Sequence, residues 1–223
     1  MPETSARRAG RPRTRVLSAE QIVDAAFELA RTAGPDGFTM TALARSLEVR
    51  PPALYHYFGG KADVVRAMRG ALAEQLDVSG FADDAVTLDT AVVRWARSYR
   101  DVTAAHPAGI ELLATTPIDG QERSVQNYDA IVRRFIAEGC PEDEAVDALV
   151  TFEALIIGSA LDAAAPDDIM APGDAGAGSP VFAAAEAARS AGASAEGIRP
   201  TDRSFALGVR ALLSGLRSEW SRG

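Results

Sequence analysis

The residues near position 55 have polar and aromatic side chains of the kinds that bind a polyanion. Arg50, Tyr55, His56 and Tyr57 supply hydrogen-bond donors and flat rings, and Lys61 follows them closely. The segment from residue 50 to residue 61 contains no acidic residue. A carboxylate on such a face would be repelled by phosphates, so its absence suits contacts to the backbone and base edges of a nucleic acid.

Residues suited to catalysis are few and far apart. The chain has two histidines, His56 and His106, and one cysteine, Cys140. A nucleophile without a neighbouring base is inert, and the sequence lacks the H-E-x-x-H, C-x-x-C and G-x-S-x-G motifs. We therefore expect no enzymatic activity, no catalytic residue, no metal site and no cofactor.

The segment before these residues is predicted to form an amphipathic helix. Ser18 is a candidate N-cap, and Gln21 follows at the spacing of a capping box. Apolar residues recur at helical spacing until the sequence Gly-Pro-Asp-Gly at 34–37, which stops the helix.

Two short helices joined by a tight turn are predicted to follow. Thr39 caps the first, Glu48 lies in the turn, and Pro51 opens the second, which is expected to run to Phe58. An amphipathic helix followed by such a pair indicates a helix-turn-helix DNA-binding domain. The second short helix is the one that carries the exposed donors and rings.

The net charge of −8 is the sum of two parts of opposite sign. Residues 1–70 contain 11 basic and 7 acidic residues, a net charge of +4, whereas residues 71–223 contain 12 and 24, a net charge of −12. Five of the arginines lie in residues 1–15, a basic arm that either contacts phosphates or only increases solubility. This split favours a DNA-facing N-terminal part and an acidic part that faces away from the duplex.

The run from Phe38 to Lys61 resembles the DNA-binding domain of the tetracycline-repressor (TetR) family of bacterial regulators. The densest match is Leu54-Tyr55-His56-Tyr57-Phe58, followed three residues later by Lys61, and the resemblance covers about residues 15–75. It implies a sequence-specific transcriptional regulator, a repressor that a small apolar ligand releases from a palindromic operator. The alternatives are a DNA-binding protein without a ligand response and a helical interaction or adaptor protein.

The resemblance also assigns DNA contacts to nine residues. It places the two threonines near the DNA backbone, Arg50, Pro51, Ala53 and His56 in the groove, and the two tyrosines and the lysine at phosphates. The nine residues are Thr39, Thr41, Arg50, Pro51, Ala53, Tyr55, His56, Tyr57 and Lys61.

Two positions depart from the family pattern. Glu48 stands where the family usually has glycine, at a position that often needs a positive φ, and there it would cost about 1 kcal/mol. Arg50 replaces the usual Ser or Thr cap, which exchanges a helix cap for a cation. Neither departure argues against the domain.

The remainder of the chain is predicted to be helical, which makes the fold class all-α: a three-helix DNA-binding domain followed by a helical ligand-binding and dimerisation domain. The segments 142–164 and 202–220 are apolar on two faces, so each needs a cover on both sides. Pairing of these helices in a homodimer would build a four-helix bundle, and the alternative is full burial within one subunit. The expected interface residues are Leu155, Ile156, Ser159, Val209, Leu212 and Leu216.

Aromatic residues of the other helices could enclose a pocket for the effector. Such a pocket is mostly apolar with a few polar groups. The candidates are Trp95, Tyr99, His106, Tyr128 and Phe152, although aromatic residues at helical spacing are individually more typical of a core.

The predicted organisation is a basic flexible arm at 1–15, the DNA-binding domain at 16–62 and the C-terminal domain at 63–223. A flexible loop that has room for a short helix at 181–189 is expected at about 165–200, because 23 of the 38 residues from Ala163 to Pro200 are Ala, Gly or Pro. No apolar run approaches the ~20 residues of a membrane span, and no secretory signal is present. We therefore expect a cytoplasmic bacterial protein.

Overall fold

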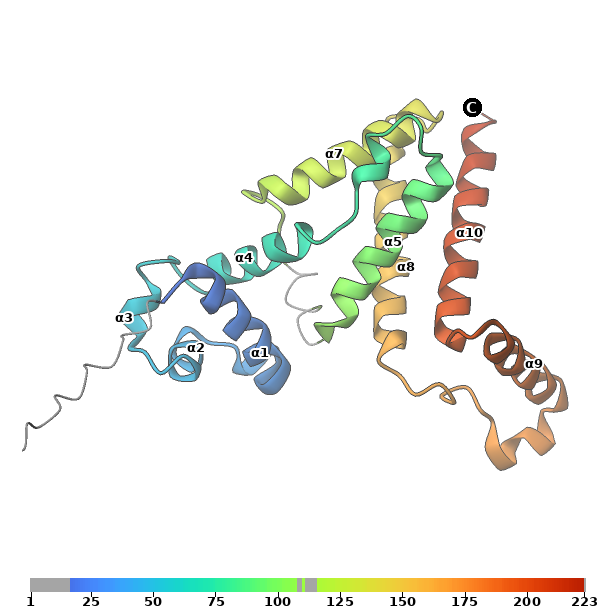
Figure 1. Ribbon diagram of the computed structural model, residues 1–223, viewed down its shortest axis with the longest axis horizontal. Coiled ribbons are helices and arrows are strands. Elements are labelled where there is room, and N and C mark those ends of the chain that lie inside the picture. The colour runs from blue at the N-terminus through green and yellow to red at the C-terminus, as the bar shows by residue number, and fades with distance from the viewer. Residues whose placement is uncertain (1–16, 108–109, 111–115, 223) are drawn as a thin grey trace, which may run out of the picture.

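The structure is a computed structural model that describes residues 17–107, 110 and 116–222 (Figure 1). Regular structure in these residues is helical, without a strand, which confirms the predicted all-α fold. The predicted basic arm at 1–15 lies outside the described residues.

The described helices follow one another along the chain. They are α1 (Ala19–Gly37), α2 (Met40–Ser46), α3 (Pro51–Leu54), α4 (Lys61–Ala73), η1 (Ser79–Phe81), α5 (Leu88–Ala104), α7 (Glu122–Ala137), α8 (Ala145–Ala163), η3 (Gly173–Gly178), α9 (Pro180–Glu196) and α10 (Pro200–Trp220). None of the described helices is long and apolar enough to cross a membrane.

The predicted ends of the first helices are confirmed. The Ser18 side chain accepts a hydrogen bond of 3.2 Å from the backbone N–H of Gln21, and the Thr39 hydroxyl accepts one of 3.1 Å from Ala42. Each cap satisfies an N–H that has no partner within its helix. The backbone of α1 leaves helical geometry at Gly34, where φ is 66°.

The second short helix is shorter than predicted. Regular helix covers only Pro51–Leu54 and continues as a turn through Tyr57. The N–H groups of Tyr57 and Phe58 both donate to the carbonyl of Leu54, at 2.9 and 3.0 Å. The prediction of a helix up to Phe58 was wrong because both donors share one carbonyl there, so the regular i to i−4 ladder does not continue.

The N-terminal hydrophobic core draws on four helices. Ile22 and Ala26 from α1, Leu43 from α2 and Leu54 from α3 are fully buried in it. Helix α4 adds residues beyond the predicted boundary at position 62, namely Val64, Val65, Met68 and Leu72. The first part of α4 is therefore part of the same packed unit as the helix-turn-helix, which we call the DNA-binding unit (residues 17–72).

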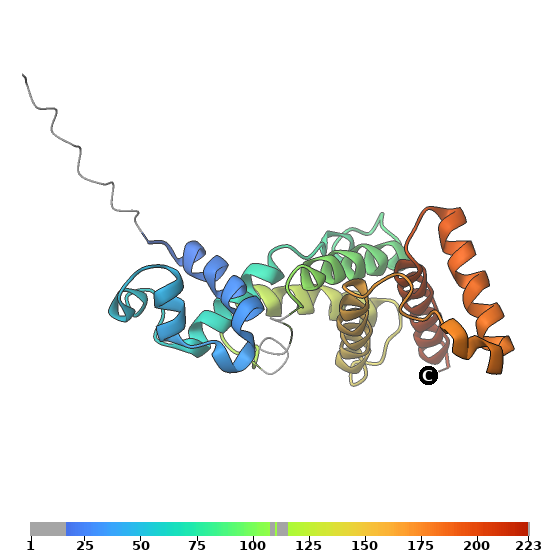
Figure 2. The same cartoon turned by 90° about the horizontal axis from the view of Figure 1, so that it is seen from below.

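The second core lies among α5, α7, α8 and α10 (Figures 1 and 2). Its largest buried side chains include Trp95, Phe135 and Phe152. The ring centroid of Phe152 lies 6.0 Å from those of both Trp95 and Phe135. The two cores lie at different places along the elongated molecule, and α4 and the chain that follows it connect them (Figure 2).

The segment 165–200 is not the flexible loop that we predicted, because it contains η3 and the 17-residue helix α9. The prediction grouped alanine with glycine and proline, although alanine is the strongest helix former and glycine and proline are the weakest. Pro180 opens α9, and Gly197 ends it in the left-handed region with φ at 67°. Helix α9 packs beside α10, at the end of the molecule away from α1–α3 (Figures 1 and 2).

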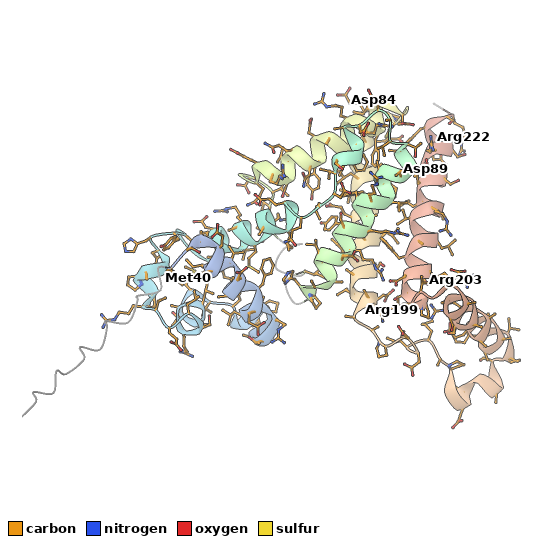
Figure 3. The ribbon with its side chains drawn as sticks, viewed as in Figure 1. Met40, Asp84, Asp89, Arg199, Arg203 and Arg222 are labelled. Atoms are coloured by element: carbon orange, nitrogen blue, oxygen red, sulfur yellow. The ribbon has the colours of Figure 1, made fainter. Side chains whose placement is uncertain are left out.

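Arg199 anchors the connection between α9 and α10 (Figure 3). Its guanidinium donates to Asp167 Oδ1 at 2.7 Å and to the carbonyl oxygens of Ala163 and Ala165 at 2.6 and 2.8 Å. The carbonyls lie at the C-terminal end of α8, where backbone acceptors lack partners within the helix. The segment after α8 is thereby held to the start of α10.

Candidate DNA interface and ligand cavity

The nine predicted DNA-contact residues lie on the packed pair α2 and α3 and on their flanking turns. Two of them, Pro51 and Ala53, are half-buried, and the other seven are exposed. Leu43 and Leu54 form the buried seam beneath them and hold the two helices together. The exposed residues are Thr39, Thr41, Arg50, Tyr55, His56, Tyr57 and Lys61.

Two of these residues also bind the backbone of the DNA-binding unit. The Tyr57 hydroxyl donates to the carbonyl oxygen of Leu17. The Lys61 Nζ donates to the carbonyl oxygen of Pro35 at 3.3 Å and lies 5.4 Å from the centroid of the Phe38 ring. The Tyr57 bond thus joins the turn after α3 to the residue before the cap of α1, and the Lys61 bond joins the start of α4 to the last turn of α1. Sequence reasoning missed these contacts, because their partners are 40 and 26 residues away.

The turn between α2 and α3 has the predicted positive φ. Glu48 adopts φ of 57°, and it is the one non-glycine residue with positive φ in the part of the chain that the structure describes. The Val49 N–H donates to the carbonyl of Ala44 at 2.9 Å and closes the turn. Arg50 precedes α3 without a side-chain cap hydrogen bond. At both positions the structure therefore shows the local consequence that the sequence predicts: a non-glycine residue at positive φ and a helix start without a side-chain cap.

A cavity of about 190 Å³ lies between α4, α5, α7 and α8. Leu72, Leu76, Ile110 and Ile157 form its apolar walls. Its polar lining includes Arg69 of α4, Tyr99 and Thr103 of α5, Ser124, Asn127 and Tyr128 of α7 and Glu153 of α8. A concave, partly open space with apolar walls and a few convergent polar groups is the usual form of a small-molecule site.

Two tyrosines and one carboxylate form a hydrogen-bonded group in this cavity. The hydroxyls of Tyr99 and Tyr128 both donate to Glu153 Oε1, at 3.1 and 2.7 Å. Burial, followed by the nearby Glu153 carboxylate, raises the pKa of both phenols. Both tyrosines are therefore neutral near pH 7 and keep the protons that they donate.

Of the five predicted pocket residues, the structure brings two, Tyr99 and Tyr128, to this cavity. Trp95 and Phe152 are fully buried in the second core instead. The His106 ring stacks on Phe27 of α1, with centroids 4.2 Å apart, and lines a separate cleft. Rings that fill a core and rings that line a cavity occupy the same inner face of a helix, so helical spacing does not distinguish them.

Apart from the two tyrosines, sequence reasoning missed the polar residues of the cavity. For Glu153 a signal was present, because it is the one charged residue between Asp147 and Asp162 of an otherwise apolar helix. For Asn127 the sequence contains no such signal. Its side-chain N–H donates to the carbonyl oxygen of Ala73 at 2.8 Å and connects α7 to the end of α4.

The six predicted dimer-interface residues divide between the interior and its edge. Ile156 and Val209 are buried in the second core of the same subunit, which leaves them no surface for a partner. The other four, Leu155, Ser159, Leu212 and Leu216, are half-buried. The apolar residues that α8 and α10 expose are Val146, Val150, Leu161 and Leu207, of which Leu207 is 61% exposed.

A helix-turn-helix with exposed donors, joined by one helix to a helical domain that contains a cavity, defines the class of helix-turn-helix transcriptional regulators. Two family models match this chain: "Bacterial regulatory proteins, tetR family" over residues 22–68 and "Tetracyclin repressor-like, C-terminal domain" over residues 82–220. The chain belongs to the tetR family of transcriptional regulators.

Curated relatives and solved structures agree with this assignment. The tetracycline repressor protein class A from transposon 1721 of Escherichia coli is 30% identical over 155 residues, 68% of this chain and 69% of that protein. The uncharacterized HTH-type transcriptional regulator YobS of Bacillus subtilis (strain 168) is 34% identical over 100 residues, 43% of this chain and 50% of that protein. The structure of SCO7222, a TetR from Streptomyces coelicolor, matches with a TM-score of 0.65 and 26% identity, covering 91% of this chain and 99% of that one.

A further solved structure shows the same fold at lower identity. A TetR variant from Acinetobacter baumannii AYE, in complex with minocycline, matches with a TM-score of 0.64 and 22% identity over 91% of this chain and 98% of that one.

Proposed function

We propose that this chain is a homodimeric repressor of the bacterial cytoplasm that binds a palindromic operator and releases it when a small molecule occupies the cavity. The observation that carries the proposal is the double role of α4. Its residues Val64 and Met68 are fully buried in the core of the DNA-binding unit, and its residues Leu72 and Ala73 line the cavity. A ligand in the cavity would therefore touch the helix that holds the DNA-binding unit.

The exposed residues of α2, α3 and their turns would make the DNA contacts. Arg50, Pro51, Ala53 and His56 would face base edges, whereas Thr39, Thr41, Tyr55, Tyr57 and Lys61 would lie along the phosphates, as the family resemblance implies. The exposed surface of seven of these residues supports this assignment. Phosphate contacts would set the register of the protein on DNA, and groove contacts would supply the sequence preference.

Two copies of the chain would read two half-sites ~34 Å apart, one turn of the duplex. The exposed apolar residues Val146 and Val150 of α8 and Leu207 of α10 support pairing of these helices with those of a second copy. Leu155, Ser159, Leu212 and Leu216 would lie at the edge of that interface. We expect Val150→Arg to produce a monomer in analytical ultracentrifugation. Val125→Arg, an exposed position on α7, is the matched control and should leave the dimer intact.

Ligand binding would act on DNA binding only through a difference in affinity between two conformations. The buried hydrogen bond from Asn127 to the Ala73 carbonyl supports α4 as the coupling element, because it joins the cavity wall to the end of that helix. A conformation of α4 that suits the ligand would change the spacing of the two DNA-binding units.

DNA selected from a random pool, followed by gel-retardation titration against competitor DNA at fixed salt, tests the proposal. We expect at least a ~10³-fold preference for the selected palindrome. The double variant Tyr57→Ala with Lys61→Ala should lose affinity and flatten the salt dependence. Arg133→Ala, which removes an exposed cation of α7, is the control. A ratio near one contradicts sequence-specific regulation, and a silent double variant favours the adaptor alternative.

A further inference from the structure

The cavity has an uneven supply of hydrogen-bond donors and acceptors. The hydroxyl hydrogens of Tyr99 and Tyr128 are both directed at Glu153 Oε1. The hydroxyl of Thr103 donates to the carbonyl oxygen of Tyr99. A hydroxyl has a single hydrogen and two acceptor lone pairs. Three lining hydroxyls have therefore already used their donors within the protein.

Apart from Arg69 and the Ser124 hydroxyl, the polar groups that line the cavity offer a ligand mainly acceptors. Each of the three hydroxyl oxygens keeps lone-pair capacity. Asn127 uses one of its two side-chain N–H groups on Ala73 and keeps its carbonyl oxygen and the other N–H. Within the described residues no hydrogen bond uses Glu153 Oε2. A ligand that offers only acceptors would cover these oxygens without giving them a donor, which is costly because it removes them from water.

Among the described residues that line the cavity, the charged ones are Glu153 and Arg69. Arg69 lines the same cavity from α4 and lowers the pKa of both tyrosines, against the larger effects of burial and of Glu153. Arg69 would favour an anionic ligand, whereas Glu153 and the acceptor oxygens favour a cationic one. Within the described lining, acceptor oxygens come from two tyrosines, a threonine, an asparagine and a carboxylate, whereas Arg69 is the one cation. The tyrosine rings add a surface on which a cationic ligand is stabilised.

The volume of the cavity suits a ligand of about one ring. A cavity of about 150 Å³ takes benzene, and this one measures about 190 Å³. The extra space is enough for a short head group. The walls formed by Leu72, Leu76, Ile110 and Ile157 would cover the apolar part of such a molecule.

We propose that the effector is a molecule of about one ring with a cationic nitrogen head group that donates several hydrogen bonds to Glu153, Tyr99 and Tyr128. The proposal rests on the proposed function in one respect, namely that this cavity is the effector site. It replaces the apolar ligand expected from the sequence by an amphipathic cation.

Benzamidinium and benzoate test the proposal directly, because the two ions have the same planar shape but opposite hydrogen bonding. Benzamidinium carries only N–H donors, and benzoate only acceptors. We expect titration calorimetry on the full-length protein to give benzamidinium a dissociation constant at least about ten-fold lower than that of benzoate. Its binding should also raise the melting temperature. Equal or tighter binding of benzoate would overturn the proposal and make Arg69 the main anchor.

Substitutions in the hydrogen-bonded group of Tyr99, Tyr128 and Glu153 test whether benzamidinium binds in this cavity. Glu153→Gln is expected to weaken benzamidinium binding about ten-fold or more, and Tyr128→Phe should weaken it less, because it removes one acceptor and keeps the ring. Asp147→Asn neutralises an exposed carboxylate on the same helix and should leave the affinity unchanged. If Glu153→Gln does not fold, the Tyr128→Phe titration decides. Unchanged affinity in the folded variants overturns the assignment.

Separate measurement of ligand binding and of DNA release distinguishes the two proposals. If benzamidinium binds as expected while the operator complex is unaffected, the ligand class stands and ligand-driven release fails. If the protein binds its operator specifically while neither probe binds at millimolar concentration, the ligand class is overturned and the DNA-binding function stands.

Discussion

The DNA-binding unit and the C-terminal domain carry their candidate functional residues on opposite sides of their helices. In the first, Arg50, Tyr55 and His56 are exposed, whereas Leu43 and Leu54 form the core beneath them. In the second, the polar residues face inward, into a cavity beside the core. An exposed site differs from its core in polarity, so a pattern along the chain can reveal it. An internal cavity shares the inner face with the core and remains hidden from such a pattern.

The largest effect is expected from a substitution that destabilises the core of the DNA-binding unit and leaves the stability of the second core unchanged. Phe38 is fully buried in the core of the DNA-binding unit, and Phe38→Ala should cost that unit about 3 to 5 kcal/mol. Both tryptophans of the chain, Trp95 and Trp220, lie in the second core. Operator binding should therefore be lost while unfolding followed by tryptophan fluorescence changes little. Phe182→Ala, on exposed α9, is the control, and an equal shift of the tryptophan signal would show that the cores unfold together.

A smaller effect is expected at the link between the two regions. Asn127→Ala removes the buried hydrogen bond to the Ala73 carbonyl and leaves that oxygen only the longer bond of 3.4 Å from the Leu76 N–H, at a cost of about 1 kcal/mol. Denaturant unfolding should show the loss, and effector-induced release from DNA should weaken with it. Gln126→Ala, at an exposed neighbouring position on α7, should have neither effect. Full stability of Asn127→Ala would remove the argument that this bond couples α7 to α4.

A modest gain in stability is expected from a substitution in the turn between α2 and α3. Glu48 is held at φ of 57°, so Glu48→Gly should relieve strain, and after the larger entropy loss of glycine the net gain is up to about 1 kcal/mol. Thermal unfolding followed by circular dichroism measures it. Glu48→Ala keeps the strain and should bring no gain, so equal stabilisation by both substitutions would point to the charge instead.

The smallest effect concerns the contact between the two regions. Burial lowers the pKa of His106 and the nearby Asp24 carboxylate opposes this shift, so the folded state binds fewer protons than the unfolded state. Stability should then fall as the pH decreases through the unfolded value of about 6.5. The decrease in the free energy of unfolding between about pH 7.5 and about pH 5.5, measured by denaturant unfolding, should be smaller in the His106→Gln variant than in the unmodified protein. An identical change in both proteins would leave the His106 and Phe27 contact without a role in pH dependence.

Local signals predicted the starts of the first three helices correctly, because each start depends on a few neighbouring residues. The caps at Ser18 and Thr39 form where their side chains meet nearby N–H groups. Glu48 has the positive φ that its position in a tight turn predicts. The error at α9 was also local, since the many alanines of that segment favour a helix and were grouped with glycine.

The cavity could not be predicted in the same way, because its residues come from four helices. Tyr99, Tyr128 and Glu153 are up to 54 residues apart, yet their oxygens lie within hydrogen-bond distance. Trp95, one helical turn before Tyr99, lies in the core instead. Which of the two rings meets the cavity depends on how α5 packs against α7 and α8.

By itself, the sequence determined the helical class, the helix-turn-helix with its caps and strained turn, and the residues that this motif exposes. These features depend on backbone propensity, capping and polarity within a few residues of each position. Only the tertiary structure decided which aromatic residues fill the core and which line the cavity, and that Ile156 and Val209 are internal while Val150 and Leu207 are exposed. It also decided that α4 belongs to both regions. The physical reason is that burial between helices depends on their relative rotation and distance, which the packing of distant segments sets.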